Sequence, residues 1–150
     1  MAMPSVTWKG DKELTRKLQR LSDAAQVRIL NQVVAAGAFV VEGYAKIEAP
    51  IDTGYMRNSI YTKTAEFSGY ADASIAAAQA LPVTAAARRS FPEGPRPQVG
   101  TAIVSVGAEY GVHVEYLTKP FMRPAVDNHR PEIERAMNVT FQREVEKAWR

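Results

Sequence analysis

The chain has 150 residues, no cysteine and a net charge of +3 from 19 basic and 16 acidic residues. This length fits a single domain over residues 1–150, and 46% hydrophobic with 23% charged residues is a globular composition. The lack of cysteine excludes disulfide frameworks, zinc fingers, thiol nucleophiles and iron–sulfur clusters. The small positive excess is spread along the chain, without the basic block of a dedicated nucleic-acid binder. We expect no signal peptide and no membrane span, because no apolar run reaches ~18 residues.

Two helices are predicted in the first third of the chain. Leucines recur at helical spacing over residues 11–21, which indicates a short helix. A second start signal at Ser22 or Asp23 then begins a broad apolar stripe over residues 23–48. Pro50 disfavours helix at the residue before it, so this long helix should end there.

Three later segments have the composition of strands. Residues 57–67 are rich in isoleucine, tyrosine, threonine and phenylalanine, and residues 101–107 are mostly β-branched or small. In residues 112–116 apolar and polar side chains alternate, which predicts a third strand. A helical turn is the alternative there, because Tyr110 and Val114 are also four positions apart.

Residues 68–98 differ in composition from the rest of the chain. They contain nine alanines and four of the nine prolines. A short helix fits residues 71–80, whereas the proline run at 92–97 excludes a regular helix or a central strand. We interpret 68–98 as an insertion loop between two strands.

The C-terminal region predicts a helix that is interrupted near its start. Pro124 suits a first helical turn, and Pro131 predicts a kink or restart. Apolar residues then recur every four positions: Ile133, Met137, Phe141, Val145 and Trp149. The order of elements predicts an α+β fold, with a long N-terminal helix and a C-terminal helix packed on a small antiparallel sheet.

Candidate chemistry is sparse. His113 and Glu115 would share a strand face, with Asp127 and His129 downstream, but neither a zincin helix motif nor a calcium loop is present. A polar, solvated face is the better interpretation. The chain also lacks a Gly-x-Ser-x-Gly elbow, a Walker A loop and a Gly-x-Gly-x-x-Gly fingerprint. We therefore predict no catalytic residue, no metal and no cofactor.

The triplet Asp52-Thr53-Gly54 has two interpretations. Aspartic proteases carry this triplet after an apolar strand, whereas here it follows a helix and Pro50. We favour a structural turn in which the Asp52 carboxylate accepts backbone N–H groups and Gly54 supplies a positive φ. Arg57 is then placed to reach a carboxylate.

Three arginines make the insertion mildly basic: Arg88, Arg89 and Arg96. They could contact DNA phosphates or an acidic partner surface. The alternative is a flexible, solvated insertion.

Two segments carry signatures that belong together. Residues 49–60 read Ala-Pro-Ile-Asp-Thr-Gly-Tyr-Met-Arg-Asn-Ser-Ile, and residues 110–125 begin Tyr-Gly-Val-His-Val-Glu-Tyr and end Pro-Phe-Met-Arg-Pro-Ala. Together, in this order, they resemble the tail-completion proteins of long-tailed bacteriophages, also described as head–tail joining proteins or minor tail components. The matching positions are Pro50, Asp52, Thr53, Gly54, Arg57, Ser59, Tyr110, Glu115, Tyr116, Pro120, Phe121, Arg123 and Pro124.

Two features depart from the family pattern. Leu117 stands where the family usually has a glycine, and residues 68–98 are longer than the usual connection between strands. No function is carried over to that insertion.

The resemblance implies a virion structural protein of the phage neck or proximal tail, without enzyme activity, made in the bacterial host cytoplasm. It implies a homo-oligomeric ring, six-fold as in related neck proteins, that joins the head connector or stopper to the tail tube or tail terminator. Passing DNA is a transient contact and a membrane is not a partner. Tail termination or another minor tail role is the alternative, and a small DNA-binding regulator is a more remote one.

Surfaces and residue roles follow from the same reasoning. Candidates for contacts between ring subunits are the small-residue patch at 35–38, the N-terminal arm and the insertion. Arg57 is expected to pair with Glu115 or Asp52. Phe121 is expected to pack against the helix at 23–48 and to fix the entry to the last helix.

Overall fold

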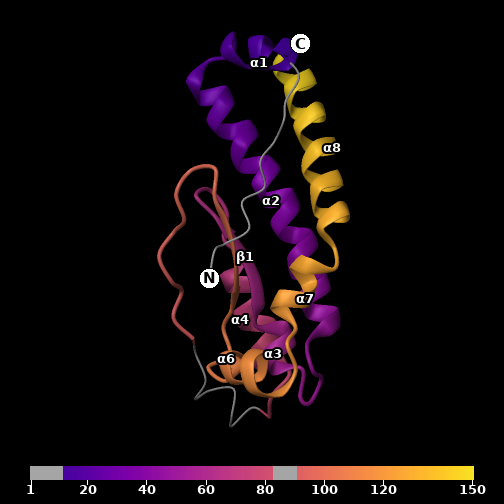
Figure 1. Ribbon diagram of the computed structural model, residues 1–150. Helices are drawn as coiled ribbons and strands as arrows, with labels where there is room; N and C mark the ends of the chain where they lie inside the picture. The colour runs from indigo at the N-terminus through magenta and orange to yellow at the C-terminus, as the bar shows by residue number, and fades with distance from the viewer. Residues whose placement is uncertain (1–11, 83–90) are drawn as a thin grey trace.

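The computed structural model describes residues 12–82 and 91–150, so the N-terminal arm, Arg88 and Arg89 lie outside the described residues (Figure 1). The elements in chain order are α1 (Lys12–Gln19), α2 (Asp23–Glu48), α3 (Tyr55–Asn58), β1 (Ile60–Thr64), α4 (Tyr70–Gln79), β2 (Ala102–Val106), α6 (Gly111–His113), the π-helical turn η1 (Val114–Thr118), α7 (Met122–Asp127) and α8 (Arg130–Ala148). The fold is α+β, as predicted. It is elongated along α2, with α8 and α7 beside that helix and the strands on its other side.

The boundaries of α2 are the ones that the sequence predicts. At its start the Ser22 side chain accepts the backbone N–H of Ala25 at 3.3 Å. At its end the N–H of Ala49 still bonds to the Ala45 carbonyl at 2.9 Å, and Pro50 follows. Local capping and the proline restriction therefore set both ends.

The α8 helix packs along α2 over most of its length (Figure 1). Val145 packs with Ile29 and Val33, joined by the partly buried Met137 and Phe141. A Cβ atom on Gly37 would lie 2.9 Å from Cγ and Sδ of Met137, so the methionine side chain packs directly over the glycine and would have to shift for any larger residue.

The small-residue patch at 35–38 is therefore filled within the chain. Ala35, Gly37 and Ala38 are all buried. This corrects the expectation that the patch meets a neighbouring subunit.

The sheet has two antiparallel strands in the described residues, with Ile60 opposite Val106 and Thr64 opposite Ala102. The prediction of a strand at 101–107 is confirmed. The strand expected at 57–67 is shorter, because residues 57 and 58 belong to α3.

The predicted third strand at 112–116 is wrong, and the helical alternative is correct. These residues form α6 and η1, and the N–H of Val114 bonds to the Tyr110 carbonyl at 3.0 Å. A strand would place Val112, Val114 and Tyr116 on one face. In the helical form only Val114 packs on the core, while Val112 and Tyr116 are 71% and 70% exposed.

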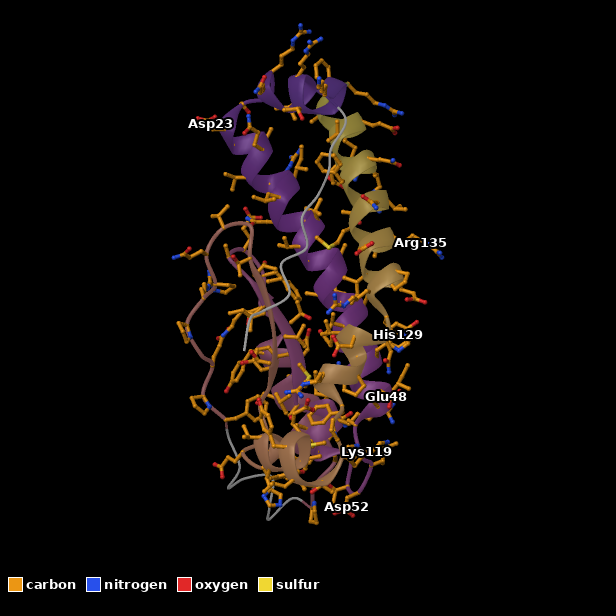
Figure 2. The ribbon with its side chains drawn as sticks, viewed as in Figure 1. Asp23, Glu48, Asp52, Lys119, His129 and Arg135 are labelled. Atoms are coloured by element: carbon orange, nitrogen blue, oxygen red, sulfur yellow. The ribbon has the colours of Figure 1, made fainter. Side chains whose placement is uncertain are left out.

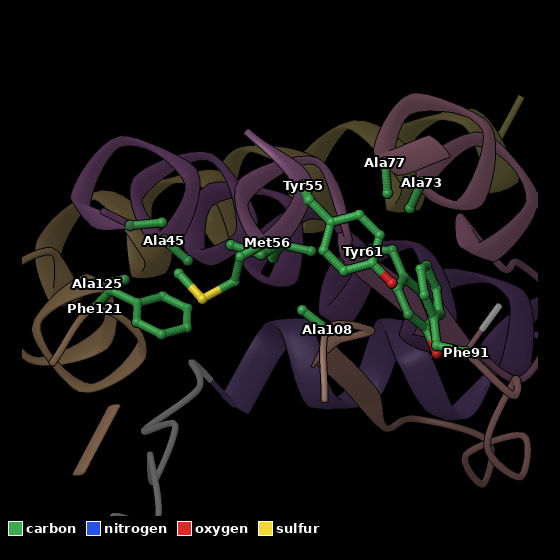
Figure 3. Close-up of a cluster of buried hydrophobic side chains, with 12 residues drawn as sticks. Ala45, Tyr55, Met56, Tyr61, Ala73, Ala77, Phe91, Ala108, Phe121 and Ala125 are labelled. Carbon is green, nitrogen blue, oxygen red and sulfur yellow. The ribbon is translucent and has the colours of Figure 1, made fainter. Parts of the chain in front are cut away.

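The main core lies where α2, α3, β1, α4 and α7 meet (Figure 3). Phe121 is fully buried there, in one cluster with Ala45 of α2 and with Ala49 just after that helix, and its ring lies beside Met56 and Ala125 in the close-up. Phe121 thus packs against the long helix, as expected from the sequence.

Part of the insertion belongs to this core. The predicted short helix is present as α4, which packs on α3 and β1 and buries Ala73 and Ala77. Phe91 is buried in the same cluster, and its carbonyl accepts a hydrogen bond from the Tyr70 hydroxyl. The insertion is therefore not only an added surface loop.

By length and composition alone α2 could cross a membrane, with a mean hydropathy of 1.4 over its most apolar stretch. In this fold it packs against α7, α8 and both strands. The core helix of a soluble protein meets the same criterion, and 33% of the apolar stretch of α2 is buried in this fold.

Candidate assembly site

The first signature forms a turn between α2 and α3. Gly54 has φ of 83°, which confirms the positive φ predicted for it. The Thr53 hydroxyl accepts the N–H of Tyr55 at 3.3 Å. Asp52 is exposed at one end of the molecule (Figure 2). Within the described residues, its carboxylate accepts no hydrogen bond from a backbone N–H of this turn. Thr53 therefore takes the role that the sequence assigned to Asp52.

Ser59 joins the two signature segments. Its side chain is fully buried, donates to the Met56 carbonyl at 2.7 Å and accepts the N–H of Ala108 at 3.0 Å. Its own carbonyl accepts the N–H of Gly107 at 3.0 Å. One serine thus links the end of the first signature to the residues just before the second.

Glu115 organises the second signature. Its Oε2 accepts the N–H groups of Phe121 and Met122 at 2.7 and 2.9 Å, and its Oε1 accepts that of Arg123 at 3.1 Å. These are the first N–H groups of α7 and its flank, which have no partner inside the helix. The carboxylate therefore caps α7 from the neighbouring turn, and Pro124 lies in the first turn as predicted.

Arg57 was expected to pair with Glu115 or Asp52, but neither pair is among the ion pairs of the described residues. The Glu115 carboxylate instead accepts the N–H groups at the start of α7, and the Arg57 side chain is exposed. Arg123 and Arg96 are also exposed. With Arg88 and Arg89 outside the described residues, no arginine cluster can be assigned.

Hydrogen bonds attach the extended segment 91–98 to β1. The buried Lys63 donates from Nζ to the Gly94 carbonyl at 2.8 Å, and the rings of Tyr61, Tyr70 and Phe91 pack together. Burial raises the pKa of the Tyr61 hydroxyl above its ordinary value of 10.0. No sequence signal pointed to these contacts, because Lys63 and Gly94 lie far apart in the chain.

The histidines and carboxylates that the sequence offered as metal ligands do not form one cluster. In residues 12–82 and 91–150 no set of three or more histidines and carboxylates is placed to hold a metal ion. Glu115 caps α7, and the His129 ring stacks on Tyr44 with centroids 3.3 Å apart.

Two apolar faces remain open on α2. We call the first the Leu30 groove, a hollow of about 370 Å³ with six apolar side chains and one glutamine: Gln26, Ile29, Leu30, Val33, Val34, Met137 and Phe141. We call the second the Phe39 face. It comprises Phe39, Val40, Gly43, Tyr44 and Ile47 of α2 with Glu132 of α8, and the ring of Phe67, from the turn after β1, packs on Phe39.

A further apolar surface lies at the end of the molecule that carries Asp52 and Lys119 (Figure 2). Ile51, Val112, Tyr116 and Leu117 are each at least 68% exposed. Among the described residues, fifteen large hydrophobic side chains are exposed, whereas nine larger than alanine are buried. Contiguous exposed apolar patches, rather than scattered single residues, mark surfaces that partners cover.

In the described residues the two signatures thus form a turn, a buried hydrogen-bonded serine and a capped helix, and the apolar side chains left exposed lie on α2 and at one end of the molecule. The family model described as "Bacteriophage HK97-gp10, putative tail-component" matches residues 12–88, just over half of the chain. The chain belongs to this family of phage tail components, which confirms the resemblance to a phage tail family, and the first signature at 49–60 lies within the matched residues. No curated protein and no solved structure gives a significant match.

Proposed function

We propose that copies of this protein form a structural ring in the phage neck. The ring joins the head connector or stopper to the tail tube during tail completion. Membership of the tail-component family supports a place in the virion tail and contacts with other virion proteins. The neck position, the six-fold ring and the particular neighbours are our proposal. Synthesis in the host cytoplasm and a role without enzyme activity belong to the same proposal.

One observation carries it: fifteen large hydrophobic side chains are exposed in the described residues, several of them on α2 and at the end of the molecule that carries Asp52. The chain also has an accessible surface of 9988 Å², whereas a compact monomer of 16.5 kDa exposes about 7,500 Å². An accessible surface of this size leaves room on each subunit for two standard interfaces of ~800 Å² each. A ring gives each subunit two such neighbours.

Particles made without this protein test the proposal. We expect negative-stain images to show filled heads separate from free tails, and joined particles to return when the gene is supplied in trans. Overlong tails would assign termination instead, and normal virions would refute both roles.

A DNA-binding role is tested separately on the purified chain. A regulator would bind duplex DNA with a steep dependence on salt concentration. We expect no binding at physiological salt, because the described basic residues include no compact cluster on the insertion.

A further inference from the structure

The Leu30 groove follows α2 between two walls. Met137 and Phe141 of α8 line it on one side. The loop before β2 approaches on the other side, since a Cβ atom on Gly100 would lie 2.6 Å from Cδ2 of Leu30. Ile29 is buried in its floor, while Leu30 remains 48% exposed. An apolar hollow that is bounded in this way along a helix fits a segment of extended chain.

Residues 1–11 join the described chain close to this groove. They precede Lys12, the first residue of α1, and α1 lies across the end of the molecule where α2 begins and α8 ends (Figure 1). The groove residues of α2 are numbered 26 to 34, so the groove extends from about 5 to about 17 Å along the helix from Asp23. The helix α1 adds ~12 Å. Eleven extended residues span up to about 36 Å, so the N-terminal arm is long enough to reach the whole groove.

The arm has the side-chain pattern of a segment with one apolar edge. Three alternate positions are apolar, Pro4, Val6 and Trp8, and three polar residues alternate with them: Ser5, Thr7 and Lys9. In an extended chain alternate side chains lie on opposite sides, so the apolar three share one edge. Val6 and Trp8 would then be about 7 Å apart, which is within the ~12 Å that the groove covers along α2.

Trp8 is the main anchor that the arm offers. Burial of a tryptophan removes about 150–250 Å² from water, and its indole N–H requires an acceptor. The groove supplies apolar side chains for the ring and one amide, that of Gln26, whose oxygen is an acceptor of the required kind. Trp8 is only four positions before Lys12, so it reaches the end of the groove nearest α1, where Gln26 lies.

We infer that the arm of each chain lies in its own Leu30 groove, with Trp8 near Gln26 and Val6 near Val34. The short connection to α1 favours the same chain over a separate molecule, because short flexible linkers give effective concentrations on the order of mM. The Phe39 face and the end of the molecule that carries Asp52 stay available for other proteins. The contact lies within one chain, so it does not depend on the ring proposed above.

Tryptophan fluorescence of the full-length chain tests the contact. The chain has two tryptophans, so Trp149→Phe leaves Trp8 as the single fluorophore. We expect its emission to be shifted to the blue and its quenching by acrylamide to be several-fold weaker than that of free tryptophan. Emission and quenching like those of free tryptophan would overturn the inference.

A charge placed in the groove should release the arm. In the Trp149→Phe chain, Leu30→Glu should shift the Trp8 emission to the red and raise its quenching to that of free tryptophan, with an unchanged circular dichroism spectrum. Val139→Glu is the matched control, because Val139 is 57% exposed on α8 and does not line the groove. Protection of Trp8 that survives Leu30→Glu, or that is lost equally in the control, would contradict the inference.

A cysteine pair distinguishes the same chain from a neighbouring copy and places no charge in the groove. The chain has no native cysteine. On oxidation, Val6→Cys with Val34→Cys should form a disulfide within the monomer, whereas Val6→Cys with Val139→Cys should stay reduced. A ladder of covalent oligomers would assign the groove to the arm of another copy, and the lack of any disulfide would assign it to a different partner. Either result would refute docking of the arm on its own chain.

Discussion

The carboxylate of Glu115 is the single acceptor group on which the start of α7 depends. It accepts three backbone N–H groups at 2.7 to 3.1 Å. The residue Phe121, which donates the shortest of these bonds, is fully buried, and Met122 is partly buried. Glu115→Ala would leave these two donors poorly satisfied, while the exposed Arg123 N–H could turn to water.

The expected loss follows from these bonds. Hydrogen bonds to a charged group contribute about 1.5–3 kcal/mol each. Counting two of them, with part recovered by water, Glu115→Ala should lower the free energy of unfolding by about 2–4 kcal/mol. For a chain of this length that corresponds to a fall in Tm of roughly 4–16 °C. Glu115→Gln keeps a neutral oxygen and should lose about half as much, because charge-assisted bonds are roughly twice as strong.

Urea unfolding followed by circular dichroism measures these changes. Glu109→Ala is the control, because Glu109 is an exposed carboxylate in the preceding loop and should change stability by less than about 0.5 kcal/mol. The reasoning would be refuted if Glu115→Ala matched this control, or if Glu115→Gln were as destabilising as Glu115→Ala.

Three further predictions concern packing and charge. Phe121→Ala should lower the free energy of unfolding by about 3–5 kcal/mol in urea titrations, and an unchanged Tm would contradict its place in the core. A Cβ on Gly107 would overlap the Phe91 ring; Gly107→Ala should therefore destabilise by about 1–3 kcal/mol, and combining it with Phe91→Ala should remove that increment in a double-mutant cycle. Lys147, which donates to Glu144 at 3.0 Å, lowers the pKa of that carboxyl below 4.5. This stabilisation is present above the unfolded-state pKa and lost as pH falls through the lowered folded-state value. Lys147→Met should thus be less stable than wild type near neutral pH, with the difference vanishing in acid; a difference that is constant with pH would contradict the pairing.

The strand prediction at 112–116 shows where sequence patterns are ambiguous. Alternation with period two and the four-residue spacing of Tyr110 and Val114 are both present in this segment. The outcome depends on the Glu115 carboxylate reaching the start of α7 and on Val114 packing on the core. Both partners lie outside the segment, so its own periodicity could not decide between the two structures.

Among the site residues too, the features with a local cause were predictable and those that depend on distant segments were not. The left-handed turn at Gly54 was predictable, because its cause lies within a few residues of the glycine. The partner of Arg57 was not, because an exposed guanidinium carries no sequence signal for one carboxylate over another. The role of Ser59 also depends on Ala108, which only the pairing of β1 with β2 brings near.

The sequence by itself determined the ends of α2, the restart before α8 and the family signatures. Caps, prolines and apolar periodicity act over a few residues, so their effects can be read locally. Only the tertiary structure decided that Gly37 meets Met137, that Phe91 enters the core and that apolar side chains of α2 such as Leu30 and Phe39 stay exposed. These features depend on which distant segments pack together, and the burial of apolar surface that drives this packing acts between segments rather than within any one of them.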